Sequence, residues 1–506
     1  MTGLPTIDPP THPVSNPPAP TTPVPQQWRP HQLRARRPLL WAILCIAGIG
    51  GLQPLDPSLH SIAFTGAVSD LGMNPGIASF VKSIGTIVLA ASMLGVGILG
   101  DRHGRRRMLV SGVTLMGVSG MITALAPDVA VFTVGRILMG VGTAMMFSMC
   151  VAIIPTLYSK AELPKAFGIF FALGSAELMV CTAFSGIILG AFGWRTMYAL
   201  VGVLALVGAV AATLLLPENR AATSRRFDVI GVLLAAVGLI ALVWSIGQAS
   251  IRGWSGSTVL FGLSIAVVTL GVFAWWEARV REPGFPIRLF AIPAFSAACI
   301  AGVLFNWADA SLLGQYPAMA LPAGVAPAVV TAIVALMYLG MVSGSAAAAT
   351  LQRRFGLSTR TMFVSGLLLC ATSLIAQLGV SAPTDIVLPA IGLFCVGFAV
   401  MWMQNPQAAV ILGCAPSDQV GAVSAVKPAV GQLGFGLGFA TAAPIASLFT
   451  TGPTLDVGGF GHGLAVEGLV FIAAAAAVAY LLRSRRTASV ATTDASASTT
   501  DAEVNR

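Results

Sequence analysis

Long apolar segments follow one another along most of the chain and leave few folds open to it. Of the 506 residues, 56% are hydrophobic and only 9% are charged. About fourteen segments of roughly 20 residues are apolar enough to cross the hydrocarbon core of a bilayer, where helices satisfy all their own backbone hydrogen bonds. We therefore predict an all-α polytopic membrane protein with spans at 40–66, 77–100, 108–126, 129–155, 165–190, 196–216, 228–248, 256–277, 293–318, 326–350, 361–380, 386–408, 421–447 and 462–482.

The arginines are distributed unevenly between the two sides of these spans. With the N-terminus inside, one side holds clusters such as Arg34–Arg37, Arg102–Arg107 and Arg483–Arg486, whereas the other side keeps only Arg195 and Arg252. This asymmetry follows the positive-inside rule. We expect a multi-pass protein of the cell (plasma or inner) membrane with both termini cytoplasmic. The net charge of +9 is then a consequence of topology, and the lipid bilayer, not nucleic acid, is the expected partner.

The two ends of the chain differ in composition from the spans. Residues 1–37 are rich in Pro, Thr and Gln, and residues 485–506 are rich in Ala, Ser and Thr. Neither segment has an apolar period, so we predict two disordered cytoplasmic tails.

A weak internal repeat divides the remaining chain. The loop Leu351–Arg360 echoes the run that begins at Leu99, and each follows an even-numbered span. We predict two six-helix bundles, at 38–217 and 286–484, joined by a linker at 218–285 that contains an extra transmembrane hairpin. Parallel repeats of six spans that hold a substrate between them are an established transporter architecture.

A short polar run interrupts the apolar sequence between the second and third spans. Its charged residues need water, so the run must lie in a loop outside the membrane. The pattern G-x-L-x-D-R-x-G-x-R-R resembles the loop signature of the major facilitator superfamily. The resemblance implies a gating loop that latches the two bundles on the cytoplasmic side, with Gly97, Asp101, Arg102, Gly104, Arg105 and Arg106 as its residues.

Further segments resemble the 14-span drug:proton antiporters of EmrB/QacA type. Leu55–Ala63 is similar to the first-span pattern of that subgroup, and Arg136–Gly142 is similar to its fourth-span R-x-x-x-G-x-G. Pro286–Phe290 and Gln432–Gly434 resemble later segments. The fifth span departs from the pattern, because Cys181–Gly186 lacks the Gly-Pro pair of the antiporter signature.

The resemblance implies a major facilitator fold of two six-helix bundles plus an inserted hairpin. It also implies proton-coupled efflux of amphipathic or cationic small molecules, drugs included, by alternating access. Two alternatives stay open: a proton-coupled transporter of one endogenous metabolite, peptide or lipid, and a membrane receptor or enzyme that keeps the fold without transport. Asp101 and Arg136 argue against the second alternative, because a static fold needs no gating residues.

Coupling to protons requires a membrane-embedded group that binds and releases a proton, and carboxylates suit this role. Asp56, Glu177 and Asp309 lie within predicted spans. Asp56 and Arg136 are about ten and about eight residues from the outer ends of their spans, so they lie at similar depths. We predict a polar cluster of Asp56, Arg136 and Lys82 that faces the cavity of the first bundle, with Arg136 and the three acids as the coupling residues.

The substrate cavity is predicted from the polar and aromatic residues inside the spans. We expect it to be lined by Lys82, His60, Asn306, Trp307, Gln315, Tyr316, Trp402, Gln404 and Asn405. Glu467 is expected to reach water near the outer start of the last span, and Lys427 enters its span from inside, where a lysine can snorkel.

Two classes of enzyme are excluded by missing motifs. The sequence has no G-x-x-x-x-G-K-[ST] and no H-E-x-x-H, so we expect neither ATP hydrolysis nor a metal cofactor. The expected protein is not an enzyme, is monomeric, and uses the proton as its coupling ion.

Overall fold

The fold consists of long helices that run side by side, as a computed structural model of residues 36–158, 162–217, 228–280, 287–414, 420–452 and 455–483 shows. Fourteen helices in these ranges are long and apolar enough to cross a membrane, which confirms the predicted class and number of spans. They are α1 (Arg36–Asp70), α2 (Pro75–His103), α3 (Arg105–Ala124), α4 (Val129–Leu157), α5 (Leu163–Phe192), α6 (Trp194–Leu215), α7 (Val229–Arg252), α8 (Ser257–Arg279), α9 (Pro293–Ala320), α10 (Pro327–Phe355), α11 (Thr359–Ile375), α12 (Val387–Gly413), α13 (Val420–Ala446) and α14 (Val457–Leu481).

Two short 3₁₀ helices, η1 (Ile287–Ala291) and η2 (Ala376–Gly379), precede α9 and follow α11. The predicted tails lie outside the described residues, except for Arg36 and Arg37, with which α1 begins. Most of the predicted linker between α6 and α7 also lies outside them.

Capping residues mark where many of the helices begin. The side chains of Asn74, Asp128 and Asp456 each accept a hydrogen bond from a backbone N–H in the first turn of α2, α4 and α14. Such caps satisfy donors that the helix itself cannot bond. The turn between α2 and α3 depends on Gly104, whose φ of 101° is a conformation that side chains with a Cβ rarely adopt.

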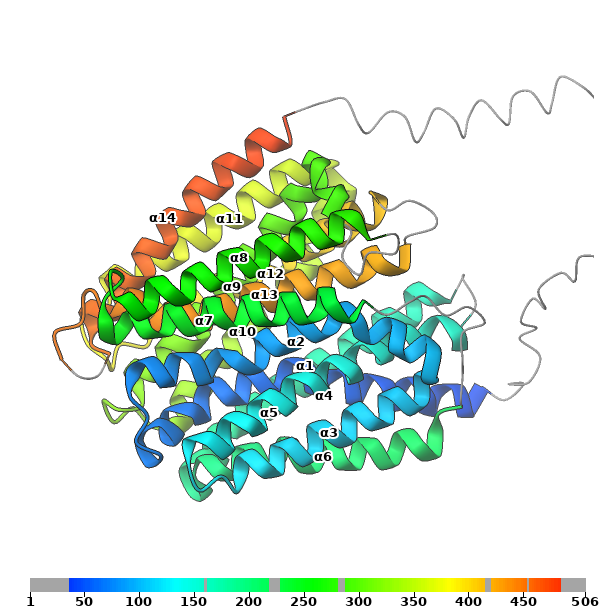
Figure 1. The fold of residues 1–506 in the computed structure, drawn as a ribbon, viewed down its shortest axis with the longest axis horizontal. Helices are drawn as coiled ribbons and strands as arrows, with labels where there is room; N and C mark the ends of the chain where they lie inside the picture. The colour runs from blue at the N-terminus through cyan, green and yellow to red at the C-terminus, as the bar shows by residue number, and fades with distance from the viewer. Residues whose placement is uncertain are drawn as a thin grey trace, which may run out of the picture.

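The helices form two groups with an extra pair at their border (Figure 1). Helices α1–α6 pack against one another, as do α9–α14, and the two groups meet where α2 contacts α13 and α5 contacts α10. Helix α7 lies against both α2 and α13, and α8 packs on α7. The inserted hairpin therefore covers one side of the border between the bundles.

Glycines allow the closest helix approaches within the bundles. A Cβ on Gly142 of α4 would lie 2.7 Å from the backbone nitrogen of Met116 on α3, which is too close for any real contact. Lipid offers no hydrophobic drive to bring helices together, so close backbone packing of this kind supplies much of the attraction.

Candidate transport site

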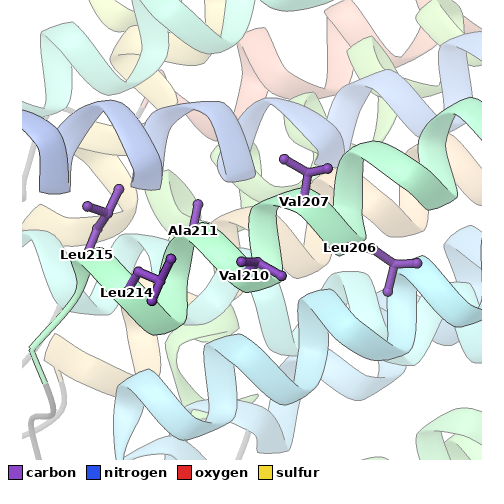
Figure 2. A pocket seen from close by; sticks show the side chains of 6 residues that line it. All are labelled: Leu206, Val207, Val210, Ala211, Leu214 and Leu215. Carbon is purple, nitrogen blue, oxygen red and sulfur yellow. The ribbon is translucent and has the colours of Figure 1, made fainter.

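Two hollows of comparable size differ in the chemistry of their walls. One, of 520 Å³, lies along the last turns of α6 and is lined only by aliphatic residues (Figure 2): Leu206, Val207, Val210, Ala211, Leu214 and Leu215. Val207 and Leu214 are 62% and 78% exposed, as expected of side chains that face lipid. A groove without a polar group can accept an acyl chain but has no means to orient a polar substrate.

The other hollow lies between the two bundles and is the candidate transport site. Its 450 Å³ are enclosed by α1, α4 and α5 of the first bundle and by α9, α10, α12 and α13 of the second. The apolar part of its wall includes Phe147, Phe170, Met337, Met341, Met401 and Phe435. The polar part includes Gln53, Ser175, Asn306, Asp309, Tyr338, Gln404, Gln407, Lys427 and Gln432.

Two prolines shape the part of the wall that α1 supplies. Pro54 and Pro57 lie inside α1 and line the cavity together with Gly50 and Gln53. A proline has no N–H to bond the carbonyl four residues earlier, so the carbonyls of Gly50 and Gln53 lose their helical donors. Both residues therefore have, beside the cavity, a carbonyl that lacks its usual helical donor.

The cavity lies toward the end of the molecule where α2 turns into α3. On α12 it is lined by residues 400–411, near the end of that helix, and on α13 by residues 427–435, near its beginning. Its lining residues on α4 and α5, 147–151 and 170–178, lie toward the same end. We call this the α2–α3 end and the other the α1–α2 end.

Direct contacts between the bundles close the α1–α2 end. The Ser79 hydroxyl on α2 donates to the carbonyl of Ala440 on α13 at 2.8 Å. The Lys82 ammonium donates to the carbonyl of Gly314 on α9 at 2.9 Å and lies 5.3 Å from the centroid of the Phe439 ring. On the opposite side of the border, a Cβ on Gly186 of α5 would lie 2.7 Å from Ala328 Cα of α10. Gly186, at the end of the stretch Cys181–Gly186, thus allows α5 and α10 to touch.

A buried ion pair lies behind the cavity wall in the first bundle. The Arg136 guanidinium on α4 donates two hydrogen bonds to the Asp56 carboxylate on α1, both 2.8 Å long. Asp56 is 6% exposed and Arg136 1% exposed. The pairing predicted from their depths is therefore present, but neither residue lines the cavity.

Aromatic residues surround this pair. The Tyr198 ring on α6 lies 5.7 Å from the Arg136 guanidinium carbon, and the Tyr198 hydroxyl and the His60 Nδ1 atom are 2.6 Å apart. His60 Nε2 lies 3.2 Å from the carbonyl of Lys82. The Arg136 Nε atom is buried without a hydrogen-bond partner. The predicted inclusion of the Lys82 ammonium is wrong, because it bonds to the other bundle.

Asp309 is the one acid of the three predicted coupling residues that lines the cavity. It is 3% exposed, and its Oδ1 atom has no hydrogen-bond partner. Tyr338, also in the wall, lies beside the hydrogen-bonded hydroxyls of Ser58 and Thr182. Glu177 on α5 lies against Gly51 of α1, next to the cavity but outside its wall.

Some of the other predicted cavity residues line the cavity and some do not, depending on which face of the helix they occupy. Asn306 and Gln404 line the cavity. The Trp307 ring packs against Phe471 of α14, with centroids 6.4 Å apart, and therefore points away from it. Gln315 and Tyr316 are buried nearer the closed end, and Tyr316 is fully inaccessible. None of these three lies in the wall of the cavity.

Helix α12 shows the same separation. The Trp402 indole N–H donates to Ser365 of α11 at 3.0 Å, and Asn405 is exposed on the outer surface of the helix. Trp402 and Asn405 lie only two and one positions from the cavity residue Gln404. Their surroundings differ from those of Gln404 because consecutive residues on a helix point in different directions.

The gating loop is described in part. The side chains of Asp101 and Arg102, and the surroundings of Gly97, lie outside what the structure describes. Arg105 donates to the carbonyl of Ala152 on α4 at 2.9 Å, and Arg106 donates to the carbonyl of Thr213 on α6. These arginines therefore tie the α2–α3 turn to two helices of the first bundle.

Several polar residues of the wall were not among the predicted cavity residues. They are Gln53, Ser175, Tyr338, Lys427 and Gln432. For Lys427, the available signal is that α13 places 427, 431 and 435 on one face, four residues apart.

The expectation for Glu467 is wrong. The residue is 1% exposed, and its carboxylate lies beside the side chains of Ser311 and Trp307. Helix α14 begins at Val457, five residues before the predicted span, so Glu467 lies about 15 Å along the helix and does not reach its end.

Two helical bundles around a polar cavity that is closed at one end define a membrane transporter of the alternating-access kind. The chain belongs to the Major Facilitator Superfamily, whose family profile matches residues 46–439. This confirms the resemblance read from the loop signature and places the chain among transporters, not enzymes.

The chain is similar to several antibiotic resistance proteins. It is 25% identical over 405 residues to the tetracenomycin C resistance and export protein of Streptomyces glaucescens, covering 79% of this chain and 74% of that protein. It is 29% identical over 247 residues to the puromycin resistance protein pur8 of Streptomyces alboniger, where the match spans 49% of each chain. A peptide transporter POT, solved in complex with sulfate, has the same fold, with a TM-score of 0.64 and 17% identity over 88% of this chain and 95% of that one.

Proposed function

We propose that this protein exports amphipathic small molecules, drugs included, across the cell membrane in exchange for protons. The observation that carries the proposal is the placement of Asp309 in the wall of a cavity between two bundles, with an oxygen that no protein group bonds. An ionised carboxylate in such a site is costly unless something neutralises it. A proton and a substrate can therefore compete for the same group, which is the requirement for exchange.

The described conformation corresponds to one half of an alternating-access cycle. The arginine asymmetry of the sequence puts the α2–α3 end and both termini in the cytoplasm. The cavity then lies on the cytoplasmic side, and Ser79 and Lys82 hold the outer side closed. Opening the outer side requires that these cross-bundle bonds break and that the α2–α3 end closes.

The Asp56–Arg136 pair is proposed to respond to protonation without touching substrate. Each guanidinium bond depends on the charge of the carboxylate, since charge-assisted hydrogen bonds are stronger than neutral ones. Protonation of Asp56 would release Arg136 and change how α1 rests on α4. Because Gln53, Pro54 and Pro57 of α1 line the cavity, such a change would reach the substrate directly.

Similarity supports the direction of transport and the substrate class. The relatives include proteins named for resistance to tetracenomycin C and to puromycin, and the first of them is also named an export protein. Both observations favour an exporter of bulky amphipathic compounds. The proton is the proposed coupling ion, and we propose a monomer as the working unit.

The test uses purified protein in proteoliposomes with an imposed pH gradient. A panel of amphipathic dyes and antibiotics should be driven against its concentration gradient by the wild type, and adding a transported compound should release protons. D309N should abolish proton-driven transport but retain facilitated exchange. The control is D385N, which removes an acid from the loop between η2 and α12, outside the spans. Transport that is unchanged in D309N, D56N and E177Q alike would refute the coupling proposal.

A further inference from the structure

Lys427 faces the cavity without a negative partner. It belongs to the stripe of α13 that also places Gly431 and Phe435 in the wall. Among the parts of the chain that the structure describes, no carboxylate lies within ion-pair distance of its ammonium and no hydrogen bond from it is present.

Two other basic side chains that lie several residues inside a described span are both engaged by protein groups. Arg136 donates to the Asp56 carboxylate. Lys82 donates to the Gly314 carbonyl and lies near the Phe439 ring. Lys427 is the exception. A cation in a membrane-embedded wall requires water or an anion to stabilise it, and the cavity that Lys427 lines can hold either.

Asp309 is the acid that shares the cavity with Lys427. The two come from different helices, α9 and α13, and are not within ion-pair distance of each other. Among the described residues, the wall therefore carries one positive and one negative group, neither of which is paired with an opposite charge on the protein. When a proton occupies Asp309, the positive charge of Lys427 remains alone.

Amides and aromatic rings occupy much of the space around these two groups. Gln404 and Gln432 present polar atoms, while Phe147 and Phe435 present rings. A volume of 450 Å³ lies within the range of small-molecule sites, roughly 300–1,000 Å³. Such a wall suits a planar aromatic body with polar substituents.

Resting on the proposed export function, we infer that the substrates carry an acidic group, a carboxylate or an acidic phenol, on an aromatic frame, and that Lys427 binds it. A zwitterion fits both charges, with its acidic group on Lys427 and its amine on Asp309. A simple cation without an acidic group is disfavoured, because it must approach Lys427 without compensation. Lys427 is therefore a specificity residue. Zwitterions and acids replace the simple cations among the expected substrates.

The experiment compares two dyes that differ only in the acidic group. A rhodamine with a free benzoate is a zwitterion, and its methyl ester is a cation of almost the same shape. Binding of each to full-length protein in nanodiscs is measured by fluorescence polarisation, and transport of each is measured in proteoliposomes. The variants are K427M, K427R and, as a matched cavity control that alters polarity without charge, Q404M.

Wild type should bind the free-acid dye more tightly than the ester. K427M should weaken binding of the free acid by about ten- to hundredfold, the range expected for loss of a charge-assisted hydrogen bond, and should leave the ester unchanged or bound more tightly. K427R should restore most of the difference. Q404M should affect the two dyes equally.

The inference would be overturned if K427M lost the same amount of affinity for both dyes, or if the wild type bound the ester more tightly than the free acid. Either result would leave the proposed export function intact. A wild type that binds and transports neither dye nor any other compound of the panel would instead refute the proposed function. If K427M does not fold, K427Q and K427R carry the comparison, since both keep a polar side chain.

Discussion

The buried pair of Asp56 and Arg136 offers the sharpest test of how the first bundle is held together. Both hydrogen bonds are 2.8 Å long and both side chains are almost inaccessible. Removing one partner of such a pair leaves the other charge buried without compensation, which costs about 3–5 kcal/mol. Removing both partners leaves no charge, so most of that cost disappears.

A double-mutant cycle of D56N, R136Q and the double variant measures this difference. We expect each single variant to lose about 3–5 kcal/mol of unfolding free energy. The double variant should lose less than the sum of the two by at least about 2 kcal/mol, a coupling within the range for directly bonded residues. Unfolding of the protein in bicelles, followed by intrinsic fluorescence, supplies the free energies.

The control is the pair formed by Asp70 and Arg195, which is about half exposed at the membrane surface. The cycle of D70N and R195Q should show no measurable coupling, because water solvates each group alone. Additive losses in D56N and R136Q, within about 0.5 kcal/mol, would refute the reasoning, since they would mean that the two charges are stabilised independently.

Three further outcomes follow from the structure. K82M removes the donor to the Gly314 carbonyl and should loosen the closed outer side. A cysteine placed at Ser79 in a cysteine-free background should then react several-fold faster with an impermeant maleimide added from outside than it does when Lys82 is present. Unchanged labelling would count against a role for Lys82 in closure. G104A should lower the unfolding free energy by about 1–3 kcal/mol, because φ and ψ at that residue are 101° and 126°, a conformation that residues with a Cβ rarely adopt; unchanged stability would contradict this. Hydrogen bonds from the backbone N–H groups of Ser381 and Ala382 hold the pKa of Asp385 below its usual value. The stability that these bonds contribute is therefore present above about pH 3.9, the usual pKa of the unfolded state. It is lost as the pH falls through the lower pKa of the folded state. Proteolysis of the loop between η2 and α12 should accordingly rise with acidification in the wild type but stay independent of pH in D385N.

Much of the architecture could be predicted from the sequence because its cause is local. A helix that crosses a bilayer must be apolar over about 20 residues, and a charged loop must lie in water, whatever the rest of the chain does. The start of α2 after Asn74 and the turn at Gly104 likewise depend on residues that are neighbours in the sequence. Depth along a helix follows from a fixed rise per residue, which is why the pairing of Asp56 with Arg136 could be predicted.

The direction in which a side chain points could not be predicted in the same way. Asn306 and Trp307 are neighbours, yet one lines the cavity and the other packs against α14. In a soluble helix, a polar face marks the side that meets water. In a membrane helix, the lipid and the neighbouring helices are both apolar. The sequence therefore does not distinguish the face that contacts lipid from the face that packs against another helix.

The residues alone indicate that this chain spans a membrane many times, that it resembles the major facilitators, and that acids and an arginine lie within its spans. The packing of the helices brings Lys82 to the second bundle, encloses Glu467, and places Lys427 and Asp309 in the wall of one cavity. The physical reason is that these properties depend on how helices distant in sequence pack and rotate against one another. No local pattern encodes that rotation.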